Sequence, residues 1–161
     1  MNFYRYETDA VYVFVMPDSK TYTEQLTDSL IIEHVKAFKF PGKWEYRMIW
    51  KSSQIAPILK RHKPDIIEVG SPYILPTVVR KNAKKIVPRA KLLGFWHADF
   101  PITYVERPIA EKFGKKLGKL ASQVAFAYAR YEFKGFTGIQ VSAEETRLRL
   151  KRKGLPAHHQ V

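Results

Sequence analysis

The first third of the chain alternates between apolar runs and turn formers, which predicts short strands and one helix. Val11–Val15 is a β-branched and aromatic run that predicts a strand buried on both faces. Ile31–Phe38 shows weaker alternation and predicts a second strand. From Trp44 the apolar spacing changes to that of a helix, through Met48, Ile49, Ile55, Ile58 and Leu59, and Pro57 is expected to kink or split it.

The rest of the chain repeats an order of strand, helix, strand, helix. Short apolar runs predict three strands, at Ile66–Val69, Leu92–Trp96 and Gly138–Val141. Ser71 followed by Pro72 predicts the start of a helix, and Ser142 with Glu145 forms a capping box for another, which Gly154 can close. This order predicts a Rossmann-like α/β domain with a mostly parallel sheet and helices on both faces.

Small and polar residues follow each of these strands. They are Gly70, Ser71, His97, Asp99 and Ser142. In an open parallel sheet, ligands bind beyond the carboxyl ends of the strands, where helix N-termini suit phosphate groups or sugar hydroxyls. The two serines can line such a site, or they can serve only as helix caps.

His97 is the strongest candidate for chemistry at this edge of the sheet. It follows an apolar strand, and an imidazole in that position can exchange a proton or bind a hydroxyl. Asp99, two residues on, is expected to orient the ring. The alternative is a loop histidine without function. We expect no metal site, because two ligands in so short a span leave a zinc site incomplete.

Charge and composition limit the kinds of molecule and metal that the chain is expected to bind. The 161 residues hold 28 Lys and Arg against 15 Asp and Glu, a net charge of +13, which favours an anionic partner. The absence of cysteine excludes disulfides and thiolate metal sites. No apolar run reaches the length of a membrane span, so we expect a soluble chain, cytoplasmic or peripheral on the inner face of a membrane.

One predicted helix has a basic face. Lys112, Lys115, Lys116 and Lys119 recur at helical spacing, while Phe113, Leu117, Leu120 and Val124 form a separate apolar stripe. The lysines can bind anionic lipid, or they can be a solvated face above a stripe that packs in the core.

Several motifs of large enzyme classes are missing. The sequence has no Gly-x-Gly-x-x-Gly after a strand, no Walker-type Gly-Lys-Ser/Thr and no Gly-x-Ser-x-Gly. A dinucleotide-binding dehydrogenase, a P-loop enzyme and an α/β-hydrolase are therefore not expected.

The ordered motifs resemble those of the N-terminal domain of family 4 glycosyltransferases, which have the GT-B fold. The resemblance spans Ala10 to Leu155. It rests on the stretches Lys63–Pro72, Phe95–Pro101 with Tyr104, and Val141–Gly154. His-x-Asp-Phe-Pro after a strand is its most specific element. These enzymes retain anomeric configuration as they move a sugar from a nucleotide donor to a lipid or another sugar.

The resemblance implies a role for each candidate residue. His97 would be catalytic and would orient or stabilise the transferring sugar. Gly70 and Ser71 would line the floor of the cleft, Asp99 and Tyr104 would shape the acceptor side, and Ser142 would cap the helix at the rim. Peripheral members bind anionic membranes through basic segments of this domain, a role implied for Lys112, Lys115, Lys116 and Lys119. Transfer in this fold needs no metal.

Two features of the family are not matched. The strand and glycine-rich turn that precede Tyr12–Pro17 in the family have no counterpart, and neither has the C-terminal nucleotide-binding domain. We therefore expect a domain over residues 1–155, truncated at both ends, with a tail at 156–161. We also expect it to be inactive alone, with donor binding supplied by a missing domain or a second chain.

Two other interpretations stay open from the sequence. The chain can be a non-catalytic basic module that binds an anionic membrane or nucleic acid, although its cations form no base-reading pattern. It can also be a degenerate fragment with no independent role.

Overall fold

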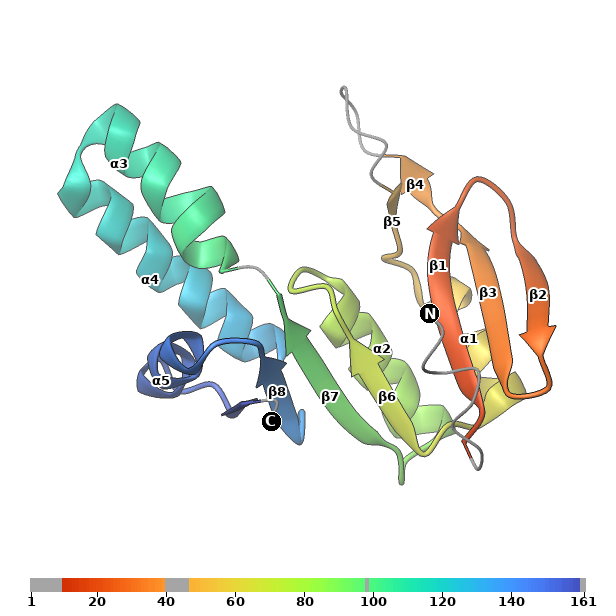
Figure 1. Cartoon of the computed structure of the whole chain (residues 1–161). Coiled ribbons are helices and arrows are strands. Elements are labelled where there is room, and N and C mark those ends of the chain that lie inside the picture. The colour runs from red at the N-terminus through yellow and green to blue at the C-terminus, as the bar shows by residue number, and fades with distance from the viewer. Residues whose placement is uncertain (1–9, 40–46, 98, 160–161) are drawn as a thin grey trace. The chain divides into compact units, whose positions relative to one another are not determined.

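The computed structural model describes residues 10–39, 47–97 and 99–159, and they belong to two compact units, Met1–Lys63 and Pro64–Val161 (Figure 1). We expected one domain over residues 1–155. The difference arises because the strands of each unit pair only among themselves in the part of the chain that is described. Each unit is therefore described by itself.

The first unit is built on a mixed three-stranded sheet of β1 (Tyr12–Asp18), β2 (Tyr22–Thr27) and β3 (Leu30–Lys36). β3 lies in the centre, parallel to β1 and antiparallel to β2. The strand predicted around Val11–Val15 is therefore confirmed, but its burial on both faces is wrong. β1 stands at an edge of this sheet, and its side chains are half-buried or exposed.

The unit is completed by the short pair β4 (Phe38–Lys39) and β5 (Arg47–Met48) and by helix α1 (Ser52–His62). α1 begins at Ser52 rather than near Trp44, and it runs through Pro57 as one helix, so of the two expected effects, a kink or a split, the split is wrong. Pro57 and Ser53 are both exposed. The carbonyl that loses its helical partner to the proline can therefore be solvated by water.

A buried carboxylate joins α1 to the central strand. Glu33 of β3 is 3% exposed and accepts hydrogen bonds from Arg61 (2.6 Å), His62 (2.6 Å) and the Thr23 hydroxyl (2.9 Å). Burial alone would raise the pKa of this carboxyl, but these three partners outweigh it and hold the pKa below its ordinary value. Glu33 therefore stays ionised and fixes the last turn of α1 against the sheet.

The second unit contains a four-stranded sheet in which every pair is parallel. Its strands, in spatial order, are β6 (Ile66–Val69), β7 (Lys91–Trp96), β8 (Gly138–Val141) and β9 (Ala157–His159). The three strands predicted here are confirmed. β9 lies in the stretch 156–161 that we expected to be a tail, and it pairs with β8, so residues 157–159 belong to the sheet.

Helices connect and flank these strands, which makes the unit a parallel α/β structure. They are α2 (Leu75–Ile86), a π-helix (Pro101–Glu106), α3 (Arg107–Phe113), α4 (Lys115–Glu132) and α5 (Glu144–Arg152). Gly154, with φ +76°, follows the end of α5 as expected. None of the described helices is both long and apolar enough to cross a bilayer.

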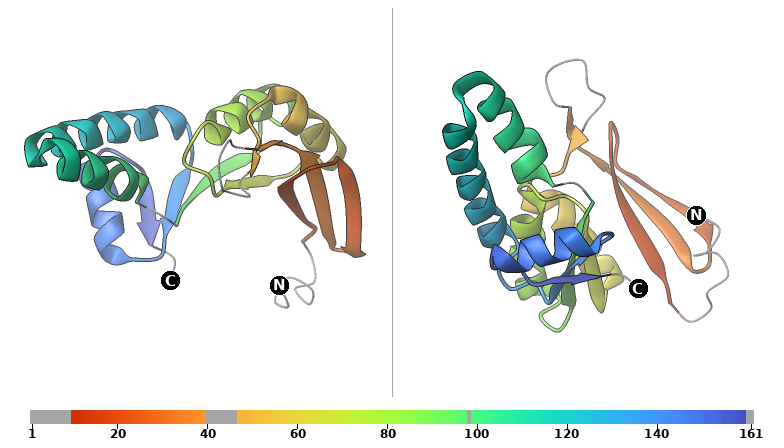
Figure 2. Two further views of the ribbon diagram at one scale, coloured as in Figure 1. Left: turned by 90° about the horizontal axis from the view of Figure 1, so that it is seen from above. Right: turned by 60° about the vertical axis from the view of Figure 1, so that its left-hand side comes forward.

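α3 and α4 form a helical hairpin that is visible in all views (Figures 1 and 2). Gly114, with φ +93°, makes the turn between them. Gly118 allows their close approach, because a Cβ at that position would come within 2.6 Å of Ala110 Cβ. The segment we expected as one basic helix is therefore two, and Lys112 lies on α3 while the other three lysines lie on α4.

The face of α4 that packs inward is not the apolar stripe, so one of the two alternatives left open by the sequence is excluded. The buried positions carry mostly small residues, and they are Gly118, Ser122, Ala125, Phe126, Ala129 and Glu132. The apolar stripe, defined as Phe113, Leu117, Leu120 and Val124, is 51–65% exposed. A core role for this stripe is wrong, because close packing against α3 favours small side chains over large ones.

The pKa of Glu33 is lower in the folded chain than in the unfolded chain, so its ionised form stabilises the fold at pH values above about 4.5. This stabilisation should be lost as the pH falls from about 4.5 through the lowered pKa. We expect Glu33→Gln to cost about 1–3 kcal/mol at neutral pH and to unfold with a weaker acid dependence than wild type. Thermal unfolding across this range measures both, with the exposed Asp28→Asn as control. Parallel loss of stability in wild type and Glu33→Gln would contradict this role.

Candidate functional site at the carboxyl ends of β6, β7 and β8

The strand register brings most of the predicted site residues to one edge of the sheet. Val69 pairs with Gly94, and Trp96 pairs with Val141. His97 and Ser142 therefore follow directly after paired residues and lie level on neighbouring strands. Gly70, which follows β6, lies level with Phe95 of β7, two residues before His97. The expectation that parallel strands share this edge is confirmed.

His97 is exposed at this edge, and among the described residues no carboxylate is paired with its ring. Its imidazole stacks on Phe95, with ring centroids 6.0 Å apart. The carboxylate of Asp99, expected to orient the ring, makes no hydrogen bond to it and forms an ion pair with Arg149, while the Asp99 backbone carbonyl accepts the N–H groups of Ile102 and Thr103 at the start of the π-helix. The expected pairing of His97 with Asp99 is therefore wrong in this structure.

Asp99 pairs instead with Arg149 of α5. Arg149 Nη2 lies 2.9 Å from Asp99 Oδ2, in an ion pair whose geometry is not that of a hydrogen bond. The Asp99 side chain is only 15% exposed. Burial raises its pKa, Glu106 raises it further, and Arg149 partly opposes the shift. The ion pair with Arg149 therefore connects the loop after β7 to the helix after β8. Because these residues are far apart in the sequence, no local pattern predicts their contact.

Carboxylates lie at the N-termini of α2 and α5, the helices that follow β6 and β8. α2 begins at Leu75 rather than beside Ser71, and its N-cap residue, Ile74, makes no side-chain cap. The N–H of Thr77 in its first turn donates instead to the buried carboxylate of Glu132 on α4 (3.1 Å). Ser71 as the cap of this helix is therefore wrong, because the cap comes from another helix.

The N-terminus of α5, the helix after β8, carries acidic side chains. α5 begins at Glu144 with Ala143 at its N-cap, so Ser142 as the helix cap is also wrong. Glu144 and Glu145 occupy the first turn, where carboxylates stabilise the helix dipole, and Arg147 forms an ion pair with Glu144. The exposed Ser142 hydroxyl is thus free of a capping role, and the edge presents hydroxyl and imidazole groups rather than a phosphate cradle.

The remaining predicted residues lie on the helices after this edge. Tyr104, on the π-helix, is 57% exposed and stands five residues beyond Asp99. Lys112, Lys115 and Lys116 surround the turn of the α3–α4 hairpin, and Lys119 follows one turn later on α4. Figure 1 places this turn away from the ends of β7 and β8. The lysines and the strand ends therefore form two separate surfaces.

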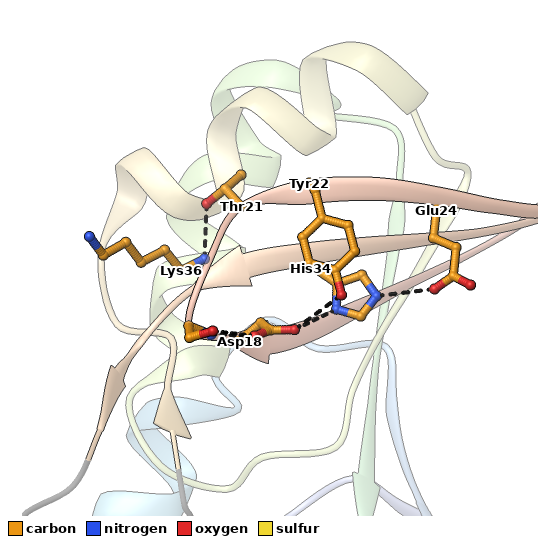
Figure 3. Close-up of polar contacts among 7 residues, drawn as sticks. Asp18, Thr21, Tyr22, Glu24, His34 and Lys36 are labelled. Atoms are coloured by element: carbon orange, nitrogen blue, oxygen red, sulfur yellow. Dashed lines mark hydrogen bonds and ion pairs between the residues drawn. The ribbon is translucent and has the colours of Figure 1, made fainter.

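The first unit holds a polar cluster that sequence reasoning missed (Figure 3). His34 Nδ1 lies 2.9 Å from Asp18 Oδ2, and its Nε2 lies 3.4 Å from Glu24 Oε2. The ring of Tyr22 stacks on the imidazole at 4.0 Å. The register that aligns Tyr22 with His34 creates the cluster, and no spacing within one strand predicts it.

This cluster connects β1 and β2 to the central strand β3 through side-chain contacts. The backbone N–H and hydroxyl of Ser19 and the ring of His34 lower the pKa of Asp18 to about 2, so its carboxylate is ionised across the neutral range. Asp18 and Glu24 approach His34 from β1 and β2. In the described part of the chain, no group of three His, Asp or Glu side chains is arranged to hold a metal ion.

Comparison with known proteins adds no assignment: no family model, curated protein or solved structure matches this chain.

Arg149→Gln should destabilise the second unit by about 1–3 kcal/mol, less than a fully buried pair would, because Arg149 is itself 36% exposed. Below its raised pKa, Asp99 is protonated in the folded chain and Arg149 has no charge to pair with, so the loss should appear as the pH rises through that raised pKa, above the ordinary value of 3.8. Adding Asp99→Asn should recover most of it. Thermal unfolding checks this against Arg152→Gln, an exposed change on the same helix. An equal loss at acid and neutral pH would argue against the pairing.

Proposed function

We propose that the second unit is the acceptor-side half of a retaining glycosyltransferase, which moves a sugar from a nucleotide-sugar donor to a lipid or saccharide acceptor. The motifs around Lys63–Pro72, Phe95–Pro101 and Val141–Gly154 support this through their resemblance to family 4 glycosyltransferases. The observation that carries the proposal is the shared edge, where His97 and Ser142 lie level on adjacent parallel strands.

The chemistry of the edge fits a polyhydroxylated ligand better than a phosphate. His97 can donate or accept a hydrogen bond at each ring nitrogen, and Ser71 and Ser142 add hydroxyl groups. The N-terminus of α2 is occupied by Glu132, and that of α5 carries Glu144 and Glu145. The phosphates of a nucleotide sugar would then bind on a separate domain, with His97 beside the transferring sugar.

The contacts refine the roles proposed for the other residues. Gly70 and Ser71 form the floor of the acceptor site, and Tyr104 offers an exposed ring beside it. Asp99 acts through Arg149, because their ion pair sets the path of the loop that carries His97. Asp99 is therefore a positioning residue in this proposal.

Binding of acceptor-type sugars to the isolated chain tests the proposal. In amide NMR titrations with neutral monosaccharides, disaccharides and inositol, we expect shifts confined to residues 70–71, 97–104 and 142. His97→Ala should weaken binding about tenfold or more, because it removes a central hydrogen-bonding group. Lys91→Ala, at the opposite end of β7, should leave binding unchanged. Absence of shifts with every sugar would count against the assignment.

Turnover by the isolated chain is the second test. We expect no sugar transfer and no micromolar binding of a nucleotide sugar, since transfer requires donor and acceptor in one closed cleft. Isothermal titration with uridine and guanosine diphosphate sugars, and an assay for their hydrolysis or transfer, measure this. Transfer by the purified 161-residue chain would overturn the division into halves.

A further inference from the structure

We infer that the α3–α4 hairpin binds an amphipathic helix of another protein, whose apolar side fills a groove along the hairpin and whose carboxylates pair with Lys112 and Lys116. The groove is separate from the strand ends, and the inference does not rest on the sugar chemistry proposed above. It rests on the juxtaposition of an uncovered apolar groove with a lysine on each of its rims.

The groove runs along the hairpin between two apolar walls and has a volume of about 720 Å³. Val105 and Ile109 line it from the first arm of the hairpin, and Leu117, Leu120 and Val124 line it from α4. The three α4 side chains are 51–65% exposed. A contiguous row of large apolar side chains in water marks an interaction surface, whereas single exposed residues do not.

Small residues form the floor of the groove. Ala121 and Ala125 lie four residues apart, so they share one face of α4. Ala125 is buried and Ala121 is half-buried, whereas the α4 wall residues are exposed, so the surface is concave. Small residues bounded by larger ones form the holes that receive the side chains of a packed helix.

The length and width of the groove match a short helix. From Leu117 to Tyr128, which lies at its inner end, α4 rises about 16 Å, or about three turns. A helix with its side chains is about 10–12 Å across, so one helix in this position contacts both walls and converts the hairpin into a three-helix bundle. An extended peptide or an acyl chain is narrower and leaves much of the walls in water.

A lysine lies beside each wall near the turn at Gly114. Lys112 follows Ile109 by three residues on α3, and Lys116 precedes Leu120 by four residues on α4, so each is the surface neighbour of a wall residue. Both lysines are exposed. A complementary helix therefore carries carboxylates beside its apolar side, at the end that lies near this turn.

These features favour an acidic helix over other occupants. An anionic bilayer meets the lysines and the tops of the walls, but a flat surface does not fill the floor at Ala121 and Ala125. Nucleic acid engages the lysines and leaves the walls in water. In a second copy of the chain, the exposed carboxylate of the described hairpin, Glu111, lies two residues after Ile109 and therefore points away from the groove.

Titration of the full chain with two synthetic peptides tests the inference. The first is an alanine-rich helix of about 18 residues with leucines at heptad spacing and glutamates beside them, and the second has lysines in place of the glutamates. By fluorescence anisotropy, we expect micromolar binding of the acidic peptide and about tenfold weaker binding of the basic one. Equal binding of the two peptides would overturn the inference.

Variants of the wall locate the binding surface. Leu120→Ser with Val124→Ser should weaken binding of the acidic peptide about tenfold or more, because it removes the apolar area that the helix covers. Both side chains are more than half exposed, so this variant should fold normally. Leu148→Ser, at an exposed position on α5, is the matched control and should bind as wild type does.

Charge reversal separates the two rims from general attraction. Lys112→Glu with Lys116→Glu should reverse the preference, so that the basic peptide binds more tightly than the acidic one. Lys84→Glu with Lys85→Glu changes the net charge equally at exposed positions on α2, and the preference for the acidic peptide should remain. The same effect from both pairs would mean attraction by net charge alone and would overturn the proposed site.

Vesicle co-sedimentation and sedimentation velocity test the other occupants. Three results would overturn the inference: no binding of the acidic peptide, tighter binding of the chain to vesicles of phosphatidylcholine and phosphatidylglycerol than to that peptide, or self-association that Leu120→Ser with Val124→Ser abolishes.

Discussion

The contact between Glu132 and the first turn of α2 places a buried carboxylate of the protein itself at a helix N-terminus on the edge of the parallel sheet. Glu132 is 3% exposed, and its carboxylate satisfies the N–H of Thr77 from within the protein. Burial, the charge of Glu132 and a hydrogen bond to it also raise the pKa of Tyr128 to about 12. A helix N-terminus that would otherwise attract phosphate is thus occupied by an internal anion. The edge is left with His97 and hydroxyl groups.

The sequence predicted the strands of the second unit well because each is a short apolar run bounded by turn formers. It failed where a partner comes from another part of the chain. Ser71 satisfies every local rule for a helix cap, yet α2 starts later, with Pro76 in its first turn and Glu132 supplying the acceptor. The pairing of Asp99 with Arg149 joins residues fifty positions apart in sequence. Such contacts depend on the tertiary arrangement, which local propensity does not encode.

The hairpin shows a different limit of sequence patterns. Hydrophobic spacing identified the face of α4 that carries the large apolar residues, but it left open whether that face packs in the core. The face that packs is lined by Gly118, Ala125 and Ala129, because small residues let the helices approach closely. Large apolar residues at helical spacing are equally consistent with a core and with an interaction surface. Only the burial of each side chain distinguishes the two.

The separation of charge within the second unit has a consequence for how its two surfaces respond to ionic strength. The exposed cations of the hairpin face solvent, where mobile ions screen interactions beyond about 8 Å under physiological conditions. The strand ends carry the exposed imidazole of His97, and a neutral ligand bound there would have no charge for mobile ions to screen. Attachment to a charged surface would therefore follow the electrolyte composition around the protein, while recognition of a neutral ligand would be largely insensitive to it.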